Sequence, residues 1–286
     1  MAAGILERAG LGLMRMNPGV TGQQQQNQAE SPRRFHAYNV GIAKTGTTSI
    51  GLMFKRYKSG HEYMFAETTE RILAWHDGEI TKESLRQFIL LRDRQGGLEM
   101  DSSTFNHHYL DILLEEFPES KFIFTIRDCY SWLDSILNMS LKFGGAAPEY
   151  RLKYGRIFGI EMQRSELASI ESFLRRSPQM LDALFKYWSE SNKRVLERLP
   201  QGRALIIRTN EITASLSGIA RFVGVPESSL IAQVSHSNRG ARDVEFLKLL
   251  DRRMLEEVSA IHCGELMKDV FPNVTLDTLN ERASLR

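Results

Sequence analysis

The chain has 286 residues, of which 42% are hydrophobic, so it can bury a large core within one domain of about 250 residues. Its 37 Lys and Arg residues against 35 Asp and Glu residues give a net charge of +2. This balance argues against bulk nucleic-acid binding and leaves only local basic patches for small anions. The two cysteines, Cys129 and Cys263, make no disulfide framework and fit a reducing cytoplasm, and we expect Cys129 to be a packing residue.

Residues 1–34 differ in composition from the rest of the chain. Arg8 and Arg15 interrupt the apolar stretch that a signal segment needs, and a glutamine-rich polar run follows at residues 21–28. This pattern predicts a disordered leader without a secretory or membrane-spanning segment. We therefore expect one folded domain at residues 35–286, a cytoplasmic location and no membrane insertion.

The remaining chain alternates strand-like and helix-like segments. An apolar run from Ala37 leads through a short loop into a helix at residues 48–57. Further helices are predicted at residues 67–75, 82–92 and 109–117, from Ser131, from Ser177 with Trp188 on its apolar stripe, and at residues 218–223 and 246–258. Strands are predicted at residues 97–101, 121–126 and 204–207, the last two buried.

This alternation predicts an α/β fold of three layers, with a central parallel sheet flanked by helices. In such folds ligands bind at the carboxyl ends of the strands. Lys44, Asp101 and Arg127 all fall at or just past predicted strand ends. The order of elements therefore places these three residues at one site.

The loop after the first strand has the layout of an anion cradle. Gly41 and Gly46 keep the glycine spacing of a Walker A loop, but Lys44 lies inside the loop and Thr47 stands where that motif has its lysine. An ATP or GTP site is therefore disfavoured, while helix N-terminal amides still suit a phosphate. The alternative is a simple turn before a helix capped by Thr47 or Thr48.

A second element follows the predicted strand at residues 121–126. Arg127 closes that strand, and Ser135 lies eight residues later in a helix. Arg offers a fixed fork of donors to phosphate, and Ser adds a short hydroxyl hydrogen bond. Taken singly, Arg127 is equally an ion-pair partner of Asp128 or Asp134. Together, the loop x-K-[ST]-G-[ST]-T and this Arg–Ser pair resemble the sulfotransferases that use 3′-phosphoadenosine-5′-phosphosulfate (PAPS).

The resemblance covers residues 38–240 and includes a weaker third element. Near its end the family often carries an Arg-Lys-Gly-like segment that closes over the 3′-phosphate. In this chain Asn238 stands in place of the Arg, Arg239 in place of the Lys, and Gly240 is retained. Arg239 is thus either a second phosphate contact or part of a basic loop with Arg242.

The resemblance implies a P-loop-like nucleotide site for PAPS and for its product, adenosine 3′,5′-bisphosphate. Lys44 would stabilise the leaving 5′-phosphate during in-line transfer to an acceptor hydroxyl or amine. No metal is expected. The residues expected to bind the cofactor are Lys44, Thr45, Gly46, Thr47, Thr48, Ser49, Arg127, Ser135 and Arg239.

The general base has three candidates after the strand at residues 97–101. Asp101 lies at the strand end, where the cleft is expected, whereas His107 and His108 offer imidazoles of near-neutral pKa. The alternatives are a turn-capping role for Asp101 and solvated positions for the two histidines. Less favoured candidates, for acceptor binding, are His61, Glu62 and Glu67.

Residues 142–177 combine glycines with aromatic side chains and are predicted to form an acceptor lid, or else a helical excursion packed on the sheet. This aromatic content favours a small-molecule acceptor such as a phenol or a natural product. A homo-oligomer is compatible with the sequence. The alternative functions are a small-molecule or nucleoside kinase, which needs an acidic Mg²⁺ ligand that Ile207-Arg208 does not supply, and a non-catalytic nucleotide-binding module.

Overall fold

Five parallel strands form the centre of the fold in the computed structural model, which describes residues 32–142, 153, 155–160, 170–232 and 244–279. The strands are β1 (Ala37–Asn39), β2 (Ser59–His61), β3 (Met100–Ser102), β4 (Lys121–Ile126) and β5 (Ala204–Arg208). Their order in the sheet is β2-β3-β1-β4-β5, and all four neighbouring pairs are parallel. The carboxyl ends of the strands therefore share one edge, as expected for a sheet of this kind.

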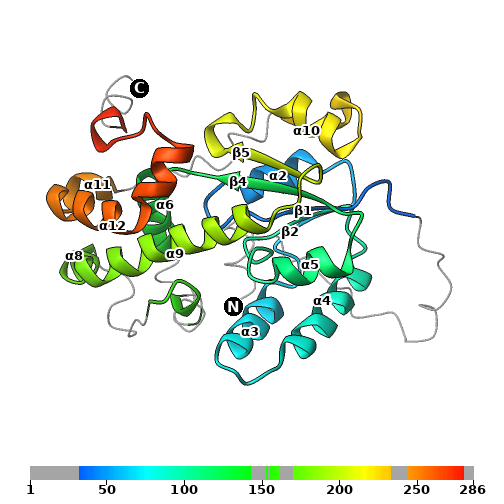
Figure 1. Cartoon of the computed structure of the whole chain (residues 1–286), viewed down its shortest axis with the longest axis horizontal. Helices are drawn as coiled ribbons and strands as arrows, with labels where there is room; N and C mark the ends of the chain where they lie inside the picture. Colours follow the sequence, from blue (N-terminus) through cyan, green and yellow to red (C-terminus); the bar gives the residue numbers. More distant parts are fainter. Residues whose placement is uncertain (1–31, 143–152, 154, 161–169, 233–243, 280–286) are drawn as a thin grey trace. The chain divides into compact units, whose positions relative to one another are not determined.

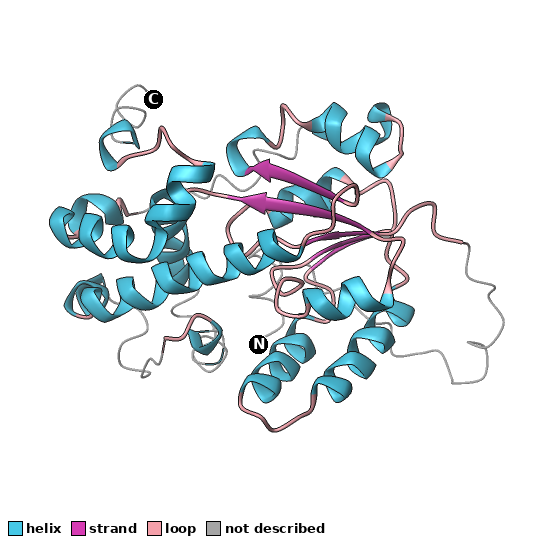
Figure 2. Cartoon of the chain, viewed as in Figure 1, coloured by secondary structure: helices cyan, strands magenta, loops and turns pink. Residues whose placement is uncertain are grey.

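Helices connect the strands and cover the sheet (Figures 1 and 2). The described α-helices are α2 (Thr47–Met53), α3 (Phe65–His76), α4 (Lys82–Gly96), α5 (Leu110–Glu116), α6 (Cys129–Lys142), α8 (Ile170–Arg175), α9 (Ser177–Arg198), α10 (Leu216–Val223), α11 (Phe246–Leu249) and α12 (Arg252–Val270). Two 3₁₀ turns, η2 (Thr209–Glu211) and η3 (Glu227–Ser229), flank α10. None of the described helices is both long and apolar enough to cross a membrane.

Side chains alternate between two cores, one on each face of the sheet. Phe122 and Phe124 of β4 join the larger core, to which α3 to α6, α9 and α12 contribute. Ile123 points to the other face and joins the smaller core, where α2 and α10 pack. This alternation follows from the two-residue period of a strand. The predicted three-layer α/β fold is confirmed, and Trp188 is fully buried in the larger core as expected.

Several predicted boundaries shift for local reasons. The helix predicted at residues 246–258 is interrupted at Leu250, because the Asp251 side chain accepts a hydrogen bond from the Met254 N–H and caps a new helix. The strand at residues 204–207 is not wholly buried, since β5 is an edge strand and Ile206 is 51% exposed. Strand β2 was not predicted at all.

The leader predicted at residues 1–34 lies almost entirely outside the described residues, so the domain boundary stays a prediction. The same is true of much of the lid predicted at residues 142–177. Within it the structure describes α8, and it also describes Ile157 and Phe158, which are buried against the larger core.

Candidate functional site

The loop at residues 41–48, which we name the phosphate loop, turns its carbonyl groups toward the protein. Four side chains donate to them: Trp132 to Ala43 at 2.8 Å, Arg127 to Lys44 at 3.4 Å, Thr209 to Thr45 at 2.6 Å and Ser102 to Thr47 at 2.7 Å. Gly46 precedes α2, and no described side chain caps that helix. The amides at the start of α2 are therefore placed as donors for an anion.

Backbone geometry fixes the shape of the phosphate loop. Lys44 has φ 67° and Gly46 has φ 108°, both in the left-handed region, which a non-glycine residue rarely adopts. Gly41 packs so closely on β4 that a Cβ atom would lie 2.6 Å from the Thr125 carbonyl oxygen. A lysine held in the left-handed region is the type of backbone outlier that is found at functional sites.

Arg127 and Ser135 lie on the segment after β4, and Arg127 contacts the phosphate loop. The Arg127 Nε donates to the Ser131 hydroxyl at 2.9 Å, and the contact with the Lys44 carbonyl brings the guanidinium to the phosphate loop. The Trp188 indole N–H donates to the Arg127 carbonyl at 3.0 Å and so fixes the strand end. Ser135 is half-buried in α6. The structure thus brings Lys44 and Arg127 together, as the sequence predicts.

A further side chain reaches the phosphate loop from the end of β2. The His61 Nε2 lies 3.1 Å from the Thr48 hydroxyl, 3.4 Å from the Thr47 hydroxyl and 3.6 Å from the Glu62 Oε1. The Glu62 side chain is 5% exposed and accepts hydrogen bonds from the Ser103 hydroxyl and the Thr104 N–H. An imidazole paired with a carboxylate therefore stands beside the loop hydroxyls.

Asp101 is the middle residue of β3, and its carboxylate is buried in an ion pair. Both of its oxygens accept from the Arg92 guanidinium of α4, one of them at 3.1 Å. Burial by itself lowers the pKa of Arg92, but the charge of Asp101, the hydrogen bonds to it and the nearby Tyr109 and Tyr38 together raise the pKa of the guanidinium.

His107 and His108 are both buried, so the alternative of solvated positions for them is wrong. The His107 Nε2 lies 3.2 Å from the Tyr187 hydroxyl, and the two imidazole rings are 4.1 Å apart. Burial lowers the pKa of His107 to about 3 and lowers that of His108 in the same direction. Both rings are therefore neutral at physiological pH.

Other predicted residues divide into buried ones and ones outside the described ranges. Arg239 and its neighbours lie outside them, so their role stays a prediction. Cys129 is fully buried, and burial raises the pKa of its thiol, which confirms its packing role. Among the residues that the structure describes, no group of three or more His, Cys, Asp or Glu side chains is placed to hold a metal ion.

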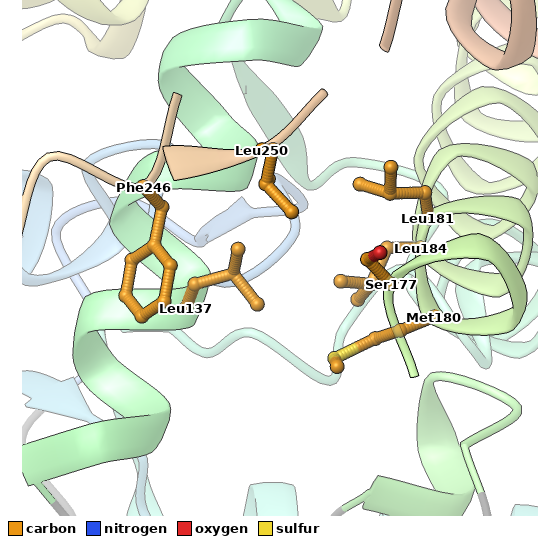
Figure 3. Close-up of a pocket in the computed structure, with 7 residues that line it drawn as sticks. All are labelled: Leu137, Ser177, Met180, Leu181, Leu184, Phe246 and Leu250. Atoms are coloured by element: carbon orange, nitrogen blue, oxygen red, sulfur yellow. The ribbon is translucent and has the colours of Figure 1, made fainter. Parts of the chain in front are cut away.

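A small cavity lies away from these residues, between α6, α9 and α11 (Figure 3). Its volume is about 10 Å³, and apolar side chains such as Leu137, Leu184 and Phe246 point toward it from both sides. A space of this size holds at most one water molecule and offers it little polar contact. We interpret it as a packing gap.

From the sequence, His61 and Glu62 are only less favoured candidates for acceptor binding, and Arg92 has no predicted role. The loop motif carried no sign of them, because their places depend on β2, a three-residue strand of Ser-Gly-His with little β propensity. The signal that could have found them is position alone: a His-Glu pair soon after the helix of a phosphate loop.

Comparisons with known proteins identify the family. A family model described as a sulfotransferase domain matches residues 38–240. The fold is similar to that of sulfotransferase STF9 from Mycobacterium avium, with a TM-score of 0.52 and 13% identity over 86% of this chain and 79% of that one. A sulfotransferase from Alicyclobacillus acidocaldarius aligns with a TM-score of 0.49 and 13% identity, over 85% of this chain and 97% of that one.

No curated protein matches the sequence. At 13% identity the Mycobacterium avium structure supports the fold alone, whereas the family model spans well over half of the chain and includes both the phosphate loop and Arg127. The chain belongs to the sulfotransferase family.

Proposed function

We propose that this protein transfers a sulfuryl group from PAPS to a hydroxyl or amine of a small-molecule acceptor. The observation that carries the proposal is the phosphate loop, whose carbonyls accept hydrogen bonds from four protein side chains and which leads into the start of α2, where Gly46 supplies no side-chain cap. Arg127 at the next strand end supplies a second anion contact beside it. Two phosphate-binding elements at one sheet edge fit a nucleotide that carries two separated phosphate groups.

The residues of the phosphate loop would hold the 5′-phosphosulfate end of PAPS. The amides of residues 46–49 and the hydroxyls of Thr47 and Thr48 would be the donors, and the Lys44 ammonium would neutralise negative charge that develops on the leaving oxygen. Arg127 and Ser135 would hold the 3′-phosphate and so fix the register of the nucleotide. PAPS supplies the sulfuryl group, and this donor set requires no metal ion.

For the proton of the acceptor we favour the His61–Glu62 pair over the three residues predicted from the sequence. His61 is 22% exposed and lies beside the hydroxyls of the phosphate loop, so it can contact both reactants. A neutral imidazole accepts a proton near pH 7, and the adjacent carboxylate stabilises the imidazolium.

The three residues predicted as bases are less well placed for that role. Asp101 accepts on both oxygens from Arg92, and His107 and His108 are buried in the core with depressed pKa values. A general base is most effective when its pKa lies near the working pH. A pKa of about 3 for His107 therefore makes this side chain a poor proton acceptor at pH 7.

The test of the donor is calorimetric titration of the full chain with adenosine 3′,5′-bisphosphate and, separately, with ATP and Mg²⁺. We expect tight binding of the bisphosphate, a loss of about 1.5–3 kcal/mol on Arg127→Ala as a charged hydrogen bond is removed, and no comparable binding of ATP. Arg208→Ala serves as the matched control, because Arg208 ends β5 and pairs with Glu211 on the surface.

Preference for ATP with Mg²⁺ would move the protein to the kinase alternative. Binding of neither nucleotide would leave a member of the family without donor binding. Once the bisphosphate binds, a screen of phenols and other small hydroxyl compounds with PAPS identifies the acceptor.

A further inference from the structure

The segment that follows β2 has an unusual backbone. Within residues 61–64, which we name the β2 turn, Glu62 has φ 57° and Met64 has φ 51°. Neither residue is glycine, and a single residue separates them. Left-handed backbone at such residues persists only where the surrounding structure holds it in place. The β2 turn contains His61, so whatever holds its backbone also sets the place of that imidazole.

Arg92 of α4 makes the main contact with the β2 turn. Its Nε and one of its terminal nitrogens donate to the Tyr63 carbonyl at 3.2 and 3.1 Å, and its guanidinium lies 5.6 Å from the centre of the Tyr63 ring. The same guanidinium donates to both oxygens of Asp101. One buried arginine therefore joins the β2 turn to the end of β3.

The segment after β3 completes the attachment. The Glu62 N–H donates to the Ser102 carbonyl at 3.2 Å, and the Glu62 carboxylate accepts from the Ser103 hydroxyl at 2.8 Å and the Thr104 N–H at 2.9 Å. Ser102 also donates to the Thr47 carbonyl of the phosphate loop. The β2 turn and the phosphate loop are thus fixed against the same strand end.

We propose that Arg92 and Asp101 form a clamp that positions the β2 turn, and with it His61, beside the phosphate loop. Both are positioning residues, because Asp101 acts through Arg92, and Arg92 acts through the Tyr63 carbonyl. The catalytic consequence rests on the proposed function above, but the structural role of the clamp does not. The forked guanidinium is essential to it, since only a planar donor with several N–H groups serves a carboxylate and a carbonyl together.

The first test measures the turn directly by hydrogen–deuterium exchange of the full-length protein. Arg92→Lys keeps the charge but loses the fork, so amide exchange in a peptide covering residues 59–66 is expected to rise about tenfold or more. Exchange in a peptide covering residues 121–126 of β4 should stay unchanged. Arg86→Lys is the matched control, because Arg86 lies on the same helix and pairs with Glu115 and Glu116 near the surface.

If Arg92→Lys exchanges no faster in residues 59–66 than Arg86→Lys, the clamp is wrong. This readout needs neither PAPS nor an acceptor. It therefore stands even if the protein proves not to bind the bisphosphate.

The second test uses PAPS and phenol as the probe acceptor. The clamp predicts that Arg92→Lys lowers kcat about tenfold with an unchanged KM for PAPS, because the donor site is not touched. If Asp101 were the base, Arg92→Lys would keep nearly full kcat, since Asp101 remains in place.

A double variant, Arg92→Met with Asp101→Leu, removes the buried pair without leaving an unpaired charge, so it is expected to fold. We also expect this variant to have a low kcat. Its kcat/KM should still fall at acidic pH, in the acidic limb of the pH profile, because His61 is still present. Disappearance of that limb would assign the base to Asp101 and overturn the proposal.

Discussion

The phosphate loop and the β2 turn meet where His61 contacts Thr48, yet different kinds of contact hold them in place. In the phosphate loop, hydroxyl, indole and guanidinium groups donate to main-chain carbonyls, so the loop is held through its backbone and not through its own side chains. The β2 turn is held instead by three buried charged side chains, Glu62 and the paired Arg92 and Asp101. Substitution of most side chains in the loop should therefore be tolerated better than substitution of a buried charge behind the turn.

The largest effect is expected for Lys44→Ala in the phosphate loop. Loss of the ammonium beside the leaving group should lower kcat by about 100- to 1,000-fold. Thermal unfolding should stay at the wild-type midpoint, because the loop is held through its carbonyls. Lys55→Ala, at an exposed position after α2, is the control. Turnover of Lys44→Ala near the wild-type rate would remove the basis of the proposed mechanism.

On the other side of the site, His61→Gln should lower kcat by about 100-fold, because the acceptor loses its general base. Affinity for adenosine 3′,5′-bisphosphate should change little, which separates this variant from Arg127→Ala. His262→Gln is the control, because His262 pairs with Asp182 on the surface. A fall in bisphosphate affinity equal to the fall in kcat would place His61 in donor binding instead.

Gly41→Ala tests the close packing of the phosphate-loop backbone against β4. The added Cβ would overlap Thr125, and overpacking of this type lowers the free energy of unfolding by about 1–3 kcal/mol. Denaturant unfolding measures the loss. Gly218→Ala in α10 is the control, since nothing described lies within 4 Å of its added Cβ, and alanine favours a helix. Equal stabilities for the two variants would contradict the close approach.

A pH-dependent effect on stability is expected from the two buried histidines, His107 and His108. The pKa of His107 is about 3 in the folded protein and 6.5 ordinarily, so between these values only the unfolded chain takes up the proton. Stability is therefore full above about pH 6.5 and falls with decreasing pH, by about 1.4 kcal/mol per pH unit for this group.

His107→Gln should make that fall shallower, although His108, whose pKa shifts in the same direction, still contributes. Denaturant unfolding between about pH 7 and pH 4 measures the slope. A slope identical to that of the wild type would show that His107 already binds its proton in the folded state.

The same contrast explains what could be predicted from the sequence. The phosphate loop is one continuous segment with a distinctive order of Gly, Lys and Thr, and Arg127 directly follows β4, whose bounds at Lys121–Ile126 match the prediction. Likewise, α9 begins at Ser177 with Pro178 in its first turn, as the apolar stripe indicated. These features depend on neighbours in the chain, which a sequence displays.

The β2 turn depends on residues far apart in the chain. Strand β2 forms because it pairs with β3, and not because Ser-Gly-His favours a strand. In this pairing Ser59 lies opposite Met100, which is 41 residues later in the chain. Asp101 was predicted as a base because its position at a strand end is visible, whereas its partner Arg92 lies on a helix whose inward face becomes known only once α4 is packed. Long-range pairing of charges was the part that the sequence did not reveal.

Two of the three tryptophans in the chain give the protein a built-in optical reporter. Trp132 donates its indole N–H to the phosphate loop at Ala43, and Trp188 donates to the carbonyl of Arg127, so each indole contacts one of the two elements that we propose to bind phosphate. Arrival of an anion at either element changes the electric field at an adjacent indole. Intrinsic fluorescence should therefore follow donor binding without a label, and Trp75→Phe would remove the emission of the remaining tryptophan, which contacts His76 on α3.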